Sequence, residues 1–155
     1  MKQKLKWLVG GLLAVLALAQ LANPARTNPP VTMDLLATNA APAHVAALLH
    51  TACYDCHSHE SRWPWYAHVA PVSWLIVHDV DEGRAHLNLS EWPAADPARA
   101  AKNLDRMSEA IDYREMPPGK YTSMHADARL SDADRKELTA WLDATAERLR
   151  PPAAK

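Results

Sequence analysis

The motif C-x-x-C-H occurs once, as Cys53-Tyr54-Asp55-Cys56-His57, and it holds the only two cysteines of the 155-residue sequence. At this spacing two thiols can bond to the vinyl groups of a haem while the adjacent histidine ligates the iron. A thioredoxin-like dithiol would need a βαβ pattern around the motif, and the sequence has no alternating strand pattern. The motif therefore predicts one covalently attached haem c, with Cys53 and Cys56 as anchors and His57 as the proximal iron ligand.

Two other interpretations of the motif are weaker. A structural zinc ion needs four ligands, and Cys53, Cys56, His57 and His59 are too crowded in sequence to surround one comfortably. A disulfide across two intervening residues is short and strained, so it would be a poor cross-link. Covalent haem attachment is therefore the leading hypothesis.

The composition favours a small helical domain. The chain has only four glycines, no phenylalanine and six tryptophans, and alanine is abundant. Few glycines and many alanines are typical of helices rather than of a turn-rich β architecture. A chain of 155 residues suits a single domain. We therefore expect an all-α domain built around one haem.

The charge of the chain excludes one class of partner. The formal net charge is −1, and without Lys2, Lys4 and Lys6 fourteen basic residues remain against eighteen acidic ones, a net charge of −4. No basic stripe is left that would attract a phosphate backbone. Binding to nucleic acid is therefore not expected.

The N-terminal segment, residues 1–22, has the pattern of an export signal. Three lysines precede sixteen uncharged residues, 7–22, among which Gln20 is the only polar one. This pattern predicts that the rest of the chain crosses the inner membrane. The run is slightly shorter than the roughly 17–25 residues of a comfortable span, and Ala17-Leu18-Ala19 is a possible cleavage site. We favour an uncleaved anchor on the periplasmic side of the bacterial inner membrane; cleavage after Ala19 would give a soluble periplasmic form.

The rest of the chain divides into a linker and a domain. Residues 23–42 are rich in proline, which predicts a linker without regular helix, and residues 43–150 are expected to form the haem-binding domain. The first helix should begin near Pro42 and end at Cys53. Further helices are predicted over residues 71–87 and 96–113, and from Ser131, capped with Asp134, to just before Pro151, with a long loop over residues 114–130.

Three tryptophans, Trp63, Trp65 and Trp74, fall within twelve positions. Large aromatic side chains of this kind can cover a flat porphyrin or fill the core of the domain. They can also form a surface that binds a redox partner protein. The sequence leaves these three roles open.

The order of these features resembles the class I cytochrome c plan, and more closely the small bacterial haem-binding domain family of exported cytochromes. The resemblance covers about residues 26–147. It implies a cytochrome c-like helical domain, haem binding and export. The runs that carry it are Cys53 to His59, Trp63-Pro64-Trp65-Tyr66, Ala70-Pro71-Val72-Ser73-Trp74-Leu75, His78 with Glu82-Gly83-Arg84, Leu87-Asn88-Leu89-Ser90-Glu91-Trp92, Met116-Pro117-Pro118, and Leu130-Ser131 through Trp141.

The resemblance also implies a sixth iron ligand. In class I cytochromes this ligand is a methionine in the late loop, commonly followed by proline, and Met116 occupies that position. The alternatives are His78, which shares a helix with Trp74, and His125 or Met124 in the late loop. Donors to the haem propionates are expected among Arg62, Arg84, Trp92 and Tyr121.

These observations leave two classes of function. The first is a single-haem electron carrier that exchanges electrons with redox partner proteins. The second is a haem enzyme of the peroxidase type, or a sensor of small ligands, which would need a displaceable sixth ligand. A stable Met116 ligand favours the carrier.

Overall fold

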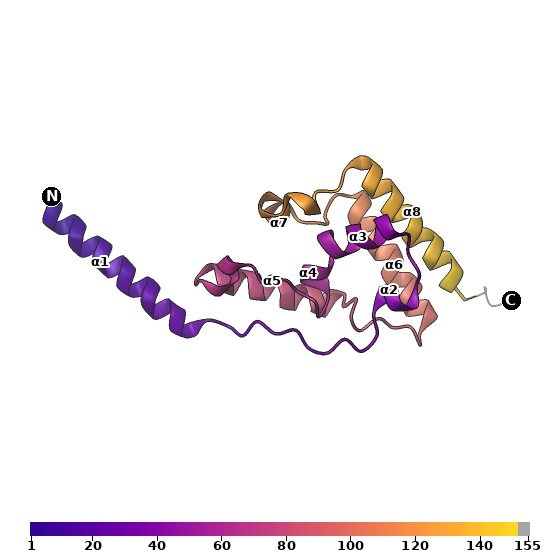
Figure 1. Ribbon diagram of the computed structural model, residues 1–155, viewed down its shortest axis with the longest axis horizontal. Coiled ribbons are helices and arrows are strands. Elements are labelled where there is room, and N and C mark those ends of the chain that lie inside the picture. Colours follow the sequence, from indigo (N-terminus) through magenta and orange to yellow (C-terminus); the bar gives the residue numbers. More distant parts are fainter. Residues whose placement is uncertain (152–155) are drawn as a thin grey trace.

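The computed structural model describes residues 1–151, and within them the fold is all-α, as the sequence predicts (Figure 1). The single β-type pairing in this part of the chain is an isolated bridge between Met33 and Glu91. The α-helices are α1 (Lys2–Ala19), α2 (Leu35–Thr38), α3 (Ala43–Ala52), α4 (Tyr54–His57), α5 (Val72–His86), α6 (Pro97–Asp112), α7 (Gly119–Met124) and α8 (Asp132–Leu149). Three 3₁₀ turns join them: η1 (Gln20–Ala22), η2 (Trp65–His68) and η3 (Ala126–Ala128).

The core of the domain lies where α6 and α8 pack along each other and against α3. Leu104 on α6 and Leu138 and Leu142 on α8 are fully buried there. Both helices begin at the predicted caps: the Asp96 carboxylate accepts from the backbone N–H of Arg99, and α8 opens with a capping box formed by Ser131 and Asp134. The predicted helix over residues 96–113 and the predicted helix from Ser131, with its cap at Asp134, are confirmed.

Three short helices, α2, α4 and α7, were not predicted. The expectation of no regular helix in residues 23–42 is wrong at α2, because the Asp34 carboxylate caps it by accepting from the backbone N–H groups of Leu36 at 2.7 Å and Ala37 at 3.1 Å. Leu35 of this helix is fully buried in the core. The predicted loop over residues 114–130 contains α7 and η3, which follow Pro118.

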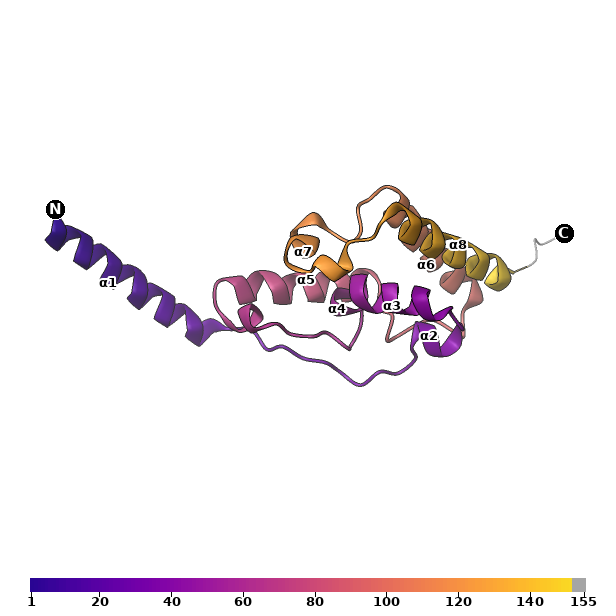
Figure 2. The same cartoon turned by 45° about the horizontal axis from the view of Figure 1, so that its top comes forward.

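The N-terminal helix α1 stands apart from the rest of the molecule, with no buried residue (Figures 1 and 2). Lys2–Ala22 is long and apolar enough to cross a membrane, a property that signal sequences share. The chain from Asn23 to Met33 then runs along the domain in an extended form. Arg84 holds it there by donating to the carbonyl oxygen of Thr27 and to the side chain of Asn28, each at 3.0 Å.

Candidate haem site

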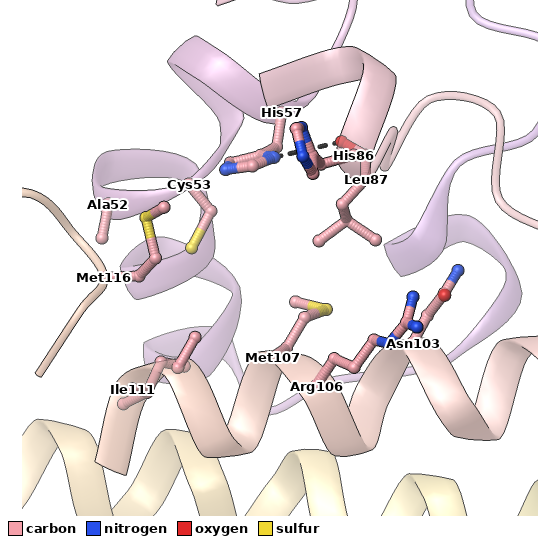
Figure 3. A pocket seen from close by; sticks show the side chains of 11 residues that line it. Ala52, Cys53, His57, His86, Leu87, Asn103, Arg106, Met107, Ile111 and Met116 are labelled. Atoms are coloured by element: carbon pink, nitrogen blue, oxygen red, sulfur yellow. Dashed lines mark hydrogen bonds between the residues drawn. The ribbon is translucent and has the colours of Figure 1, made fainter. Parts of the chain in front are cut away.

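A cavity of about 400 Å³ lies beside the C-x-x-C-H motif (Figure 3). Its volume falls in the range of small-molecule sites, roughly 300–1,000 Å³. Its wall includes residues from the ends of α3 and α5, from α6 and from the segment before α7. The lining residues are Ala52, Cys53, His57, His86, Leu87, Asn103, Arg106, Met107, Ala110, Ile111 and Met116.

His57 is held by its Nδ1 atom. This nitrogen lies 2.9 Å from the carbonyl oxygen of Gly83 and 3.1 Å from that of Leu87. Both partners are acceptors, so Nδ1 carries the proton and donates, which leaves Nε2 free to bind a metal. Burial lowers the pKa of His57, so the neutral, ligating form dominates at neutral pH.

The helices α4 and α5 approach each other closely at Gly83. A Cβ atom at this position would lie 2.6 Å from the backbone oxygen of Cys56. Only glycine allows this approach without a shift of one helix. The same approach brings the carbonyl oxygen of Gly83 to His57, so the glycine positions the imidazole of His57.

The two cysteines are free and partly buried. Cys53 lines the cavity, and Cys56 faces α5 at Gly83. Burial, followed by the neighbouring Cys56, raises the pKa of the Cys53 thiol to about 12, and burial, followed by the charge of Asp55, raises that of Cys56 to about 11. Both groups are neutral thiols at neutral pH, unlike the acidic thiol of a redox-active C-x-x-C motif.

Two methionines reach the cavity from different elements (Figure 3). Met116 comes from the segment between α6 and α7 and is 39% exposed, whereas Met107 comes from α6 and is 7% exposed. Met107 belongs to the buried core of the domain. Its position on the cavity wall makes it a further candidate ligand that sequence reasoning missed.

The other predicted ligands lie outside the cavity wall. His78 is exposed on α5, and Met124 is 64% exposed at the end of α7. Nε2 of His125 is hydrogen-bonded to the hydroxyl of Tyr66 at 3.0 Å, and the imidazole ring stacks on Tyr121.

None of the four residues expected to hold the propionates lines the cavity. Arg62 and Tyr121 both bind the carboxylate of Asp55. Arg84 donates to the carbonyl oxygen of Ser58 at 2.7 Å and to the linker, and Trp92 is buried with no partner for its Nε1. These side chains hold the domain together beside the cavity instead.

The donors that do line the cavity are Arg106 and Asn103 on α6. They share a face of that helix with Met107 and Ala110, because residues three and four apart lie side by side. The sequence could have indicated that Asn103 and Arg106 share a helix face with Met107, because their spacing is helical. Only the packing of α6 shows that this face meets the C-x-x-C-H motif. His86 is a third polar side chain on the wall.

The chemistry of the wall fits a haem. Apolar side chains can contact a porphyrin, His57 offers a neutral imidazole nitrogen, and Met116 and Met107 offer thioethers. Arg106 and Asn103 can donate to carboxylates. Of the three roles left open for Trp63, Trp65 and Trp74, a haem cover has no support from this cavity, because none of the three lines it and the latter two are exposed.

Comparison with known proteins gives two matches. Residues 14–144 match the model of a family described as a haem-binding domain. The chain is also similar to cytochrome c peroxidase Ccp of Escherichia coli (strain K12), with 29% identity over 98 residues, which are 61% of this chain and 21% of the relative. The chain thus spans about one fifth of that relative's length. No solved structure matches.

Proposed function

This chain belongs to the haem-binding domain family, and we propose that it carries one haem, attached covalently, as a single-electron carrier outside the cytoplasmic membrane. The observation that carries the proposal is the convergence of Cys53, His57 and Met116 on one apolar cavity. A haem bound there would supply a one-electron iron couple. The apolar wall would limit the access of water to it.

Each residue of the site has a role in this proposal. Cys53 and Cys56 form the two thioether links, and His57 binds the iron through Nε2 while its Nδ1 donates to the backbone of α5. Met116 is the proposed distal ligand, with Met107 as the alternative on the cavity wall. Arg106 and Asn103 replace Arg62, Arg84, Trp92 and Tyr121 as the proposed donors to the propionates.

The proposed location follows from the N-terminal helix. The segment Lys2–Ala22 is long and apolar enough to span a membrane, and its three lysines come before its uncharged residues 7–22, which favours the bulk of the chain on the outer side. Covalent attachment of haem takes place outside the cytoplasm, so this side also suits the motif. We propose an anchored periplasmic domain that exchanges electrons with redox partner proteins.

The covalent link is tested on the full-length protein produced with its export segment. After denaturation and acid extraction, intact mass spectrometry should show the chain plus one haem. The Cys53→Ser and Cys56→Ser variants should each keep haem through the remaining thioether, and the double variant should release it on extraction. A wild-type chain with two unmodified thiols and extractable haem would refute the covalent site.

A second candidate function is a haem peroxidase or small-ligand sensor. Similarity to cytochrome c peroxidase favours it, as does the exposure of Met116, 39%, which would ease displacement of the sixth ligand. His86 and Arg106 also line the cavity; His86 could serve as an acid–base group, and the guanidinium of Arg106 could stabilise negative charge. Ligand binding to the reduced protein separates the two functions, as argued below.

A further inference from the structure

An exposed apolar surface lies at the start of α5. The sequence contains no Asp, Glu, Lys or Arg over residues 63–78. Within this stretch five large hydrophobic side chains are exposed to solvent: Trp65 at 78%, Leu75 at 54%, Val69 and Val72 at 44%, and Trp74 at 42%. Exposed apolar side chains grouped in this way mark interaction surfaces. We refer to these five residues as the Trp65–Leu75 surface.

This surface is bound to the end of the apolar N-terminal segment. The side-chain amide of Gln20 donates to the carbonyl oxygen of Ala70 at 3.2 Å and accepts from its backbone N–H at 3.0 Å. The indole N–H of Trp74 donates to the carbonyl oxygen of Ala22 at 3.0 Å. Asn23 adds a bond to the carbonyl oxygen of His68 and one from the hydroxyl of Ser73.

These contacts fix the height of the surface relative to a membrane. Figures 1 and 2 both show the end of α1 beside the start of α5. The sixteen uncharged residues 7–22 span roughly 24 Å as a helix, which is less than the ~30 Å of a hydrocarbon core. Gln20 and Ala22 are therefore drawn to the edge of the lipid, and the residues bound to them lie at the same level.

We propose that the Trp65–Leu75 surface docks onto the periplasmic face of the lipid bilayer. Tryptophan favours the membrane interface, where its ring contacts acyl chains and its N–H remains hydrogen-bonded, and aliphatic side chains bury apolar area there. The surface has no formal charge that would orient a protein partner, which favours lipid as its occupant. The inference goes beyond the proposed electron carrier and rests on retention of the anchor.

Docking would also limit where the haem cavity lies relative to the membrane. His86 and Leu87 line the cavity at the far end of α5, and the fifteen residues of this helix extend about 22 Å. The docked start of α5 would thus hold one end of a rigid spacer. The spacer restricts the positions that the cavity can take relative to the membrane.

The test places a fluorescent NBD group on single cysteines in the full-length haem protein, reconstituted in phosphatidylcholine vesicles. The labelled sites are Val69→Cys and Leu75→Cys on the surface, Leu13→Cys in α1, and Ala144→Cys, exposed on α8, as a matched control. Lipids with a doxyl group quench a label that lies at their depth in the bilayer. The depth is read from the ratio of label fluorescence with and without these lipids. Because the haem quenches both measurements equally, its effect cancels in the ratio. The protein without an added cysteine is treated with the same reagent, and it shows how much label Cys53 and Cys56 themselves take up.

The labels at residues 13, 69 and 75 should be quenched strongly by doxyl lipids, and the label at residue 144 should not. Adding Val72→Asp to Val69→Cys should reduce quenching of the residue 69 label at least twofold. An aspartate in the first turn of α5 suits the helix dipole, so this variant keeps the fold.

Lipid quenching at residue 13 with water-like labels at 69 and 75 would overturn the docking and leave the anchor intact. If the labels at residues 69 and 75 became shielded from water only when a redox protein was added, the surface would bind a protein partner instead of lipid. A label at residue 13 in water would overturn both the anchor and the docking. None of these three outcomes would bear on the haem site, which the mass measurement tests separately.

Discussion

At Gly83 only a hydrogen atom fits on the α-carbon, because a Cβ would lie 2.6 Å from the backbone oxygen of Cys56. Gly83→Ala should push α4 away from α5 and lower the free energy of unfolding by about 1–3 kcal/mol. It should also weaken the bond between His57 and the Gly83 carbonyl, which a changed haem absorption spectrum would show. Urea unfolding followed by circular dichroism measures the first effect.

Gly119→Ala is the matched control for this substitution. Nothing lies within 4 Å of a Cβ at Gly119, and the residue begins α7. Alanine there should leave the stability unchanged or raise it by up to about 1 kcal/mol. If the two alanine variants unfold at the same urea concentration, the close approach of α4 and α5 is wrong.

The two cavity methionines should respond differently to substitution. Met116→Ala should remove the weak red charge-transfer band of iron–thioether ligation from the oxidised protein and lower its reduction potential. It should change the stability little, because Met116 is 39% exposed. Met107→Ala should keep the band but lower the free energy of unfolding by about 2–5 kcal/mol, since Met107 is 7% exposed. Loss of the band in Met107→Ala alone would reassign the sixth ligand.

At the scale of one element, the start of α8 should make stability depend on pH. Hydrogen bonds from Ser131 lower the pKa of Asp134 below its ordinary value of 3.8, and the side chain of His44, 3.0 Å away, adds to this. A depressed pKa means that the stabilisation is complete above pH 3.8 and is lost as the pH falls through the folded-state pKa. Asp134→Asn should therefore flatten the acid end of a curve of unfolding free energy against pH. Equal curves for the two proteins would show that the capping box contributes nothing through its charge.

Whether a helix could be predicted from the sequence depended on its length. The helices α3, α5, α6 and α8 have ten residues or more, and the sequence predicted the bounds of all four closely. The four residues of α2 and six of α7 are too short to show a period or to form alone. Packing stabilises α2 instead, because Leu35 is buried in the core and Tyr54 donates to Asp34 at 2.9 Å.

At the scale of the whole molecule, the sequence predicted the parts of the site that are adjacent in the chain. Cys53, Cys56 and His57 form one motif, and Met116 follows from a family pattern. Arg106 and Asn103 could not be predicted, because their place on the cavity wall depends on how α6 packs across the motif. Likewise the sequence left the role of the tryptophans open, and only tertiary contacts show that Trp74 lies beside the end of the N-terminal segment, where its indole N–H donates to the carbonyl oxygen of Ala22.

Carbon monoxide distinguishes a carrier from an enzyme or sensor, because it binds iron(II) only where the sixth position is open or easily vacated. If Met116 closes the iron, the reduced wild-type protein should stay low-spin and bind the gas poorly. Met116→Ala should bind it readily, because the cavity then has room at the iron. His78→Ala is the matched control, since His78 is exposed outside the cavity wall, and it should behave as wild type.

The opposite result would favour the second candidate function. Wild-type protein that binds carbon monoxide readily, with a spectrum that Met116→Ala does not alter, has no methionine ligand. Peroxide consumption with a reduced cytochrome as electron donor would then separate an enzyme from a sensor. In an enzyme, Arg106→Leu and His86→Ala should each slow turnover, because both side chains line the cavity and could move a proton or stabilise charge at the bound oxygen atoms. In a sensor, both variants should change the affinity for the ligand, and neither they nor the wild-type protein should consume peroxide.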